Sequence, residues 1–311
     1  MQQAEKLELK NLIKAKAGQL GFDLVGVCLP DYEPVEHDNL LNWLNKDFNA
    51  KLTYLASNPR LRCDPRLFFN DVQTIVAVGI NYYREPHYQA DRPYISIYAR
   101  GKPYQQVVQA KLRKLLAYIQ ELNPRARGKI AVDSSPTFDK LWAEKAGLGW
   151  RGKNTLLINK KIGSFVFLGE LFLNIELEPD QPGSDHCADC RKCIDKCPTG
   201  ALEEPHVLDA ARCISYLTIE HEGELAEPGL LGNHLFGCDL CQLVCPYNSN
   251  IAVTRVPEFR EKSDYFHGDN TWTDLTEKEF KTRYVGTVFG EYGLYRCNKN
   301  LIAVRDNMAN M

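Results

Sequence analysis

Apolar residues along the first 180 positions follow two patterns, one with the period of a helix and one typical of a buried strand. Residues 1–21 and 104–122 repeat apolar side chains three and four positions apart, which predicts two amphipathic helices. A shorter helix is expected around residues 40–48. Short, mostly apolar runs predict strands at 22–29, 74–83, 94–101 and 129–133. This part of the chain therefore combines helices with strands.

The pattern continues through residue 175. Ser135 followed by Pro136 is typical of a helix start, and predicts a helix over residues 135–147 with Ser135 as its N-cap. Residues 155–175 contain two apolar runs, which predict two strands joined across a turn at Lys160–Gly163.

A change in composition then indicates a domain boundary. The segment Glu178–Asp185 is rich in Pro, Asp and Gly and interrupts the alternating pattern. We therefore expect a first domain over residues 1–180, a cysteine-rich domain over 181–250 and a helical tail over 251–311. Within the tail, helices are expected near residues 276–284 and 295–304.

Composition narrows the class of protein. Hydrophobic residues make up 44% of the chain and charged residues 25%, values typical of soluble globular proteins. No apolar run approaches the ~20 residues of a membrane span, and the N-terminal segment lacks the apolar core of a signal peptide. We therefore expect a cytoplasmic protein. The net charge is +4 over residues 1–186 and −6 over 187–311, an asymmetry too weak to indicate nucleic-acid binding by itself.

Eleven cysteines are unusual in a chain expected in a reducing compartment. One group has the spacing C-x2-C-x2-C-x3-C-P of bacterial ferredoxins and consists of Cys187, Cys190, Cys193 and Cys197. The other group is one cysteine short of that motif and consists of Cys238, Cys241 and Cys245, followed by Pro246. Cys213 supplies the missing ligand. Eight thiols are the number that two [4Fe–4S] clusters require.

In the ferredoxin motif, three thiolates bind one cluster and the fourth binds the other. The expected ligands of one cluster are Cys187, Cys190, Cys193 and Cys245. The expected ligands of the second are Cys197, Cys213, Cys238 and Cys241. A zinc site typically pairs two cysteine knuckles at a distance, and the compartment disfavours disulfides. Cys28 is interpreted as a small buried apolar residue.

Two other features are candidate sites. The motif GLGWRG at Gly147–Gly152 matches G-x-G-x-x-G, but it follows a predicted helix and precedes a strand, which is the reverse of a dinucleotide-binding loop. Gly147 and Gly149 are therefore interpreted as turn residues that end the helix. Asp133 follows a predicted strand, where loop residues often perform chemistry. Its position is also compatible with an ordinary turn aspartate, and the residues alone favour that alternative.

Five ordered blocks together resemble the epoxyqueuosine reductase family. They are the segment Asp133–Pro136 with EKAGLGWRGKNTLLIN, then GSFVFLGELFLNI, CADCRKCIDKCPTGAL, RCISYLTIE and GCDLCQLVCPYN. The resemblance covers nearly the whole chain. It implies an α+β fold, in which a mixed sheet flanked by helices, similar to nitroreductases, binds cobalamin and is followed by a ferredoxin-like domain with two [4Fe–4S] clusters.

The resemblance also implies a reaction. Members of the family reduce the epoxide of epoxyqueuosine, at the wobble position of tRNAs with a GUN anticodon, to the alkene of queuosine. Electrons pass through the clusters to cobalamin, and a flavodoxin or ferredoxin would suit as donor. Asp133 matches the family's proposed proton donor, because an epoxide oxygen must be protonated as it leaves. Cobalamin contacts are implied for Arg62, Asp133, Lys153, Asn154, Leu168, Ser215, Cys238 and Asp239.

Two departures from the family pattern concern substrate and cofactor binding. Pro103 and Gln105 stand where the family usually has an aspartate and a histidine. Many members also continue into C-terminal helical repeats that help to hold tRNA, whereas this chain ends at Met311, so the resemblance leaves open how tRNA is held. A monomer is the family expectation.

Three hypotheses follow. The first is a tRNA-modifying reductase, which the ordered blocks favour. The second is a related cobalamin reductase acting on a small molecule, which would be active without RNA. The third is an electron carrier, which would bind clusters but no corrin, and the size of the first domain argues against it.

Overall fold

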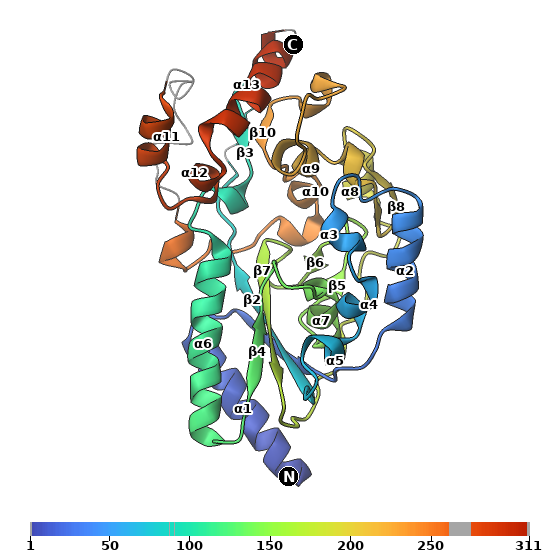
Figure 1. The fold of residues 1–311 in the computed structure, drawn as a ribbon, viewed down its shortest axis with the longest axis vertical. Coiled ribbons are helices and arrows are strands. Elements are labelled where there is room, and N and C mark those ends of the chain that lie inside the picture. The colour runs from blue at the N-terminus through green and yellow to red at the C-terminus, as the bar shows by residue number, and fades with distance from the viewer. Residues whose placement is uncertain (1, 87, 90, 261–274, 310–311) are drawn as a thin grey trace.

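The computed structural model describes residues 2–86, 88–89, 91–260 and 275–309 (Figure 1). The elements up to residue 180 are α1 (Gln3–Gln19), β1 (Leu24–Cys28), α2 (Pro34–Asn45), α3 (Thr53–Ala56), α4 (Pro59–Cys63), α5 (Pro65–Phe68), β2 (Thr74–Asn81), β3 (Tyr94–Ile95), the 3-10 helix η1 (Ile97–Ala99), α6 (Tyr104–Leu122), β4 (Gly128–Ala131), α7 (Asp139–Lys145), β5 (Trp150–Arg151), β6 (Leu157–Ile158) and β7 (Val166–Leu173). The later elements are α8 (Lys192–Lys196), β8 (Leu202–Glu204), β9 (Val207–Leu208), η2 (Ala210–Arg212), α9 (Ile214–Ile219), η3 (Pro228–Leu231), β10 (His234–Phe236), α10 (Leu240–Leu243), η4 (Pro246–Asn248), η5 (Pro257–Phe259), α11 (Glu277–Arg283), α12 (Val288–Tyr292) and α13 (Leu294–Ala309).

A four-stranded sheet in the order β1-β2-β7-β4 forms the centre of the first domain, and all its pairings are antiparallel. Helices α1 and α6 cover one face and α7 covers the other (Figure 1). Successive side chains of a strand point to opposite faces. Val76 and Val78 of β2 accordingly belong to the core under α1 and α6, whereas Ile75 and Ala77 belong to the core under α7.

The predicted α+β class is confirmed, but two element boundaries were wrong. The helix predicted from Ser135 begins at Asp139, because the side chain of Asp139 accepts hydrogen bonds from the preceding loop and closes it. The strand predicted over 94–101 ends at Ile95. There the carboxylate of Asp239 accepts the Ile97 N–H at 2.8 Å, and the chain turns into η1 instead of extending.

The turn predicted at Lys160–Gly163 is present, since Asn159 and Gly163 form a bridge. The strand before the turn, β6, pairs with β5 and not with β7, so the two predicted strands lie in different sheets.

The connector at Glu178–Asp185 is fastened to the first domain. The Asp180 side chain accepts the Val27 N–H at 2.9 Å and forms ion pairs with Lys10 and Lys14 at 3.2 and 2.6 Å. Further along, β10 pairs with β3 in parallel, and α12 and α13 pack over this pair in one core. This core therefore joins side chains from before residue 180 with side chains from after it. No helix in the described residues is long and apolar enough to cross a membrane.

Candidate active site

The cysteines of the 187–245 segment all have free thiols and lie in or next to short helices. Cys213 directly precedes α9 and Cys245 directly precedes η4. Backbone N–H groups that follow these residues hydrogen-bond to their sulfurs and lower the thiol pKa, although burial outweighs this effect and raises it. Such N–H donors stabilise a thiolate, which is the form that binds metal.

The thiols fall into two groups, according to which thiols raise the pKa of one another by their charge. Burial raises the pKa of Cys245, and the charges of Cys187, Cys193 and Cys190 raise it further. Burial likewise raises the pKa of Cys238 to about 12, and Cys213 and Cys197 are the thiols that add to this effect. We call Cys187, Cys190, Cys193 and Cys245 the first thiol group. We call Cys197, Cys213, Cys238 and Cys241 the second thiol group.

These sets are the two ligand sets expected from the ferredoxin spacing. Within the described residues, no three His, Cys, Asp or Glu side chains converge closely enough to hold a single metal ion. A [4Fe–4S] cluster needs a wider arrangement, because each thiolate binds a different iron of the cube. The number, chemistry and grouping of the thiols therefore fit two clusters. Burial raises the pKa of Cys241, and the charge of Cys193 adds to this, so the two groups are adjacent.

Trp150 borders the first thiol group, and no pattern in the sequence singles it out. Its indole N–H donates to the Cys187 sulfur at 3.4 Å, and its ring packs edge-on against His186 and Tyr247. The GLGWRG motif places it there. Gly147, with φ of +76°, turns the chain after α7. A Cβ on Gly149 would lie 2.1 Å from the Ile158 carbonyl oxygen, so only glycine allows this close approach beside Trp150.

Asp133 lies just beyond β4, with its side chain exposed. Its φ of +52° is a left-handed turn conformation, as the alternative of a turn aspartate anticipated. The side chain is nevertheless held in place, because Gln105 Nε2 donates to Asp133 Oδ2 at 2.9 Å. Tyr104 hydrogen-bonds to the same carboxylate and stacks on Phe167 with ring centroids 4.1 Å apart. The departure from the family pattern at Gln105 is therefore a direct contact of the predicted acid.

Arg62 and Lys140 both lie near Asp139, and Lys140 also lies near Cys241 of the second thiol group; we call the region around these two cations the recess. Burial lowers the pKa of Arg62, and its Nε is a buried donor with no partner among the described residues. Lys140 is exposed, and desolvation lowers the pKa of its ammonium group. The charges of Asp139 and Cys241 act on this ammonium group. Arg62 thus offers an unsatisfied donor and Lys140 an exposed ammonium group, which fit the amide and phosphate groups of cobalamin.

Three of the predicted cofactor contacts hold the thiol-bearing loops. Asn154 Nδ2 donates to the Cys241 carbonyl oxygen at 3.4 Å. The Ser215 side chain hydrogen-bonds to the Cys213 sulfur and lowers its pKa, against the larger effect of burial. The Asp239 carboxylate accepts from the Tyr94 and Ser96 hydroxyls at 2.8 and 2.6 Å, as well as from Ile97.

Two others occupy different surroundings. Lys153 Nζ donates to the Ala188 carbonyl oxygen, beside the first thiol group. Leu168 lies on β7, opposite Gly79 of β2, and packs against the core under α7. For all five residues, contact with a cofactor stays a prediction.

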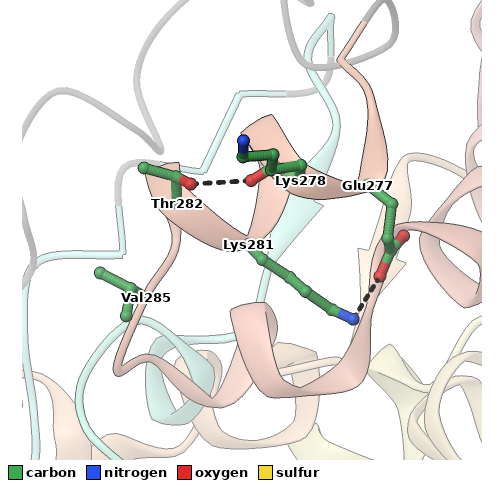
Figure 2. A pocket seen from close by; sticks show the side chains of 5 residues that line it. All are labelled: Glu277, Lys278, Lys281, Thr282 and Val285. Carbon is green, nitrogen blue, oxygen red and sulfur yellow. Dashed lines mark hydrogen bonds and ion pairs between the residues drawn. The ribbon is translucent and has the colours of Figure 1, made fainter.

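A surface depression on α11 is an alternative candidate. Figure 2 shows its lining, which consists of Glu277, Lys278, Lys281, Thr282 and Val285. Lys281 is paired with Glu277 at 3.1 Å, and the Thr282 hydroxyl donates to the Lys278 carbonyl oxygen at 2.8 Å. It contains no thiol and no predicted site residue, so we assign no chemistry to it.

Comparison with known proteins agrees with this arrangement. Residues 62–134 match the family model described as epoxyqueuosine reductase QueG, DUF1730, and residues 186–248 match that of a 4Fe-4S double cluster binding domain. The epoxyqueuosine reductase of Leadbetterella byssophila is 38% identical over 94% of this chain and 97% of its own length. That of Escherichia coli is 38% identical over 82% of this chain and 70% of its own.

Solved structures give the same result. A crystal structure of epoxyqueuosine reductase with an epoxyqueuosine-modified tRNA-Tyr stem loop is 29% identical, with a TM-score of 0.87 over 97% of this chain and 82% of that chain. A Bacillus subtilis epoxyqueuosine reductase, described with its catalytic aspartate loop swung out of the active site, is 28% identical, with a TM-score of 0.85 and the same coverage. On these similarities and on its two thiol groups, the chain belongs to the epoxyqueuosine reductase family.

Proposed function

We propose that this protein reduces epoxyqueuosine at the wobble position of tRNAs with a GUN anticodon to queuosine, using electrons that pass through two [4Fe–4S] clusters to bound cobalamin. The observation that carries the proposal is the position of Lys140, which lies near Cys241 of the second thiol group and near Asp139, the residue that bonds the Asp133 backbone. The proposal includes a cytoplasmic, monomeric enzyme and an external electron donor such as a flavodoxin or ferredoxin.

The order of electron transfer follows from the positions of the thiol groups. The charge of Cys241, in the second group, acts on Lys140 in the recess and on Tyr82. The first group lies beside Trp150 and Lys153, with Asp189 exposed between its cysteines. Electrons would therefore enter at the first group and leave from the second. Bound cobalamin would supply the strongly reducing centre that breaks the C–O bonds.

Removal of an epoxide oxygen as water, leaving an alkene, consumes two electrons and two protons. Asp133 is the acid that this chain offers, because its carboxyl is exposed at the end of β4 and is oriented by Gln105 and Tyr104. Its hydrogen-bonded position is suited to protonating an oxygen as it leaves. Arg62 Nε and Lys140 Nζ would hold the polar groups of the cofactor in the recess.

The test is an anaerobic assay of the protein reconstituted with iron, sulfide and cobalamin. A chemical reductant and an epoxyqueuosine-containing anticodon stem loop are added, and the digested RNA is analysed for queuosine by mass spectrometry. Formation of queuosine is the expected result. Cobalamin binding without queuosine would make the small-molecule reductase the leading hypothesis, and failure to bind cobalamin would leave an electron carrier.

A further inference from the structure

Glu170 is a fully buried acid in the middle of β7. Its register partners are Ala77 on β2 and Ala131 on β4, and all three side chains are 0% exposed. The two alanines leave room for the longer side chain on the face covered by α7. Neither carboxyl oxygen of Glu170 meets a hydrogen-bond donor in the described part of the chain. An ionised carboxylate in this position would be strongly disfavoured.

The side chain of Asp139, the first residue of α7, lies within hydrogen-bonding reach of Glu170. Asp139 already acts as an acceptor with both oxygens. Its Oδ1 accepts from the Thr137 hydroxyl at 3.1 Å, and its Oδ2 accepts from the Asp133 N–H at 3.2 Å. Two carboxyl groups in contact attract each other only when one of them is protonated.

The surrounding groups decide which acid carries the proton. The charge of Asp139 acts on Lys140 of α7 and Arg62 of α4, and it also interacts with Asp133 and Tyr104. On the side of β1, Glu170 faces the thiol of Cys28, whose pKa burial raises.

Burial also raises the pKa of Glu170 well above its ordinary value, and the charge of Asp139 adds to this. Burial raises the pKa of Asp139 as well, but the hydrogen bonds of Thr137, Glu170 and the Asp133 N–H to Asp139 lower it. The hydrogen bond with Asp139 instead raises the pKa of Glu170, so the proton belongs on Glu170.

We propose that Glu170 is a buried, protonated acid that donates its O–H to Asp139, and that this carboxyl pair positions the backbone of Asp133. A positive φ is uncommon outside glycine and persists where the surroundings hold it. Asp139 supplies that support by accepting the Asp133 N–H, and Glu170 holds Asp139 in place by donating a hydrogen bond to it. Glu170 is thus a positioning residue, and its effect on the reaction rests on the proposed role of Asp133.

The protonation state is tested by infrared difference spectroscopy of the reconstituted protein at neutral pH. Wild type minus Glu170→Gln should show the carbonyl band of a protonated carboxylic acid. Glu8 is exposed on α1, so wild type minus Glu8→Gln should show a carboxylate band instead. A carboxylate band for Glu170 would overturn the proposal, whether or not the enzyme makes queuosine.

The positioning role is tested by comparing two substitutions of similar size. Glu170→Met fits the core but cannot donate, so kcat should fall roughly tenfold or more with little change in KM, because the acid is misplaced. The Glu170→Gln amide can donate to Asp139 and should restore most of the lost rate.

A folded Glu170→Met protein with both clusters and the wild-type kcat would contradict the role. If the wild type makes no queuosine, the proposed function fails, and the infrared result still decides the carboxyl pair.

Discussion

The second thiol group and the carboxyl group of Asp139 both lie near Lys140, but the thiol groups and the carboxyl groups follow different patterns in the sequence. Eight of the eleven cysteines belong to the thiol groups, at spacings that a cubane cluster imposes. Only three of the forty acidic residues form the carboxyl set of Asp133, Asp139 and Glu170, and their spacing follows no motif. A metal cluster needs a rare residue type at fixed intervals, whereas a proton site needs a common residue type in an uncommon environment.

Burial raises the pKa of the buried groups in both regions, but the hydrogen bonds that oppose this effect differ. Burial raises the pKa of the thiols, and backbone N–H donors oppose it by stabilising the thiolates that metal binding requires. Burial raises the pKa of Glu170 as well, but no donor opposes it in the described structure, and the neutral acid is the form that serves Asp139. Each site therefore uses the protonation state that its backbone surroundings favour.

The largest effect is expected from Cys241→Ala in the second thiol group. Loss of one ligand next to the recess should remove one cluster, lower the iron content by about half and abolish queuosine formation. Iron analysis and the RNA assay measure both. Cys28→Ala is the matched control, because Cys28 is a buried thiol in β1 away from both groups, and its iron content should be unchanged. Full activity at half the iron would contradict the proposed order of electron transfer.

Asp133→Asn should affect catalysis without affecting the clusters. Asparagine has nearly the same shape and tolerates a positive φ, but it cannot deliver a proton, so kcat should fall about 10²- to 10⁴-fold. Iron content and the cluster spectrum should match those of the wild type, because Asp133 makes no contact with a thiol loop among its described hydrogen bonds. An unchanged kcat would remove Asp133 as the acid.

Glu170→Gln should change how stability depends on pH. The pKa of Glu170 is raised above its ordinary 4.5 in the folded state, so the stabilising protonated form is complete below that value and is lost as pH rises through the folded pKa. This loss has a slope of at most about 1.4 kcal/mol per pH unit, and glutamine does not show it. The melting temperature of the variant relative to wild type should therefore rise between about pH 5 and about pH 8. A constant difference across this range would contradict the shifted pKa.

The smallest effect is expected from Trp150→Phe. Phenylalanine keeps the ring between His186 and Tyr247 but removes the N–H donor to Cys187. That donor favours the more negative, reduced cluster, so its loss should lower the reduction potential of the first cluster. A redox titration followed by EPR measures the shift, with the second cluster as an internal reference. Equal shifts in both clusters would point to a general packing change.

The sequence predicted most of the regular structure but not the turns that shape the site. Helices α1 and α6 and strands β1 and β2 fall within their predicted ranges, and β4 overlaps its own, because long periodic or apolar runs identify them. The start of α7 and the end of β3 were missed for one reason. Before α7, Asp139 at the end of the loop accepts the Asp133 N–H. After β3, Asp239 from a distant segment accepts the Ile97 N–H. In both places the bond of a carboxylate to the backbone overrides the local conformational preference.

The sequence alone determined the cluster chemistry, since thiol number and spacing are local properties of the chain, and its ordered blocks identified the family. The ferredoxin spacing also assigned Cys213 and Cys245 to their groups, whereas only the tertiary structure placed Gln105 against Asp133. The tertiary structure also determined that Glu170 is buried. Within the run FLGELFL an acid could face solvent or core, and only the pairing with β2 and β4 beneath α7 buries it. Burial and register are set by distant segments, and they decide which acids hold a proton.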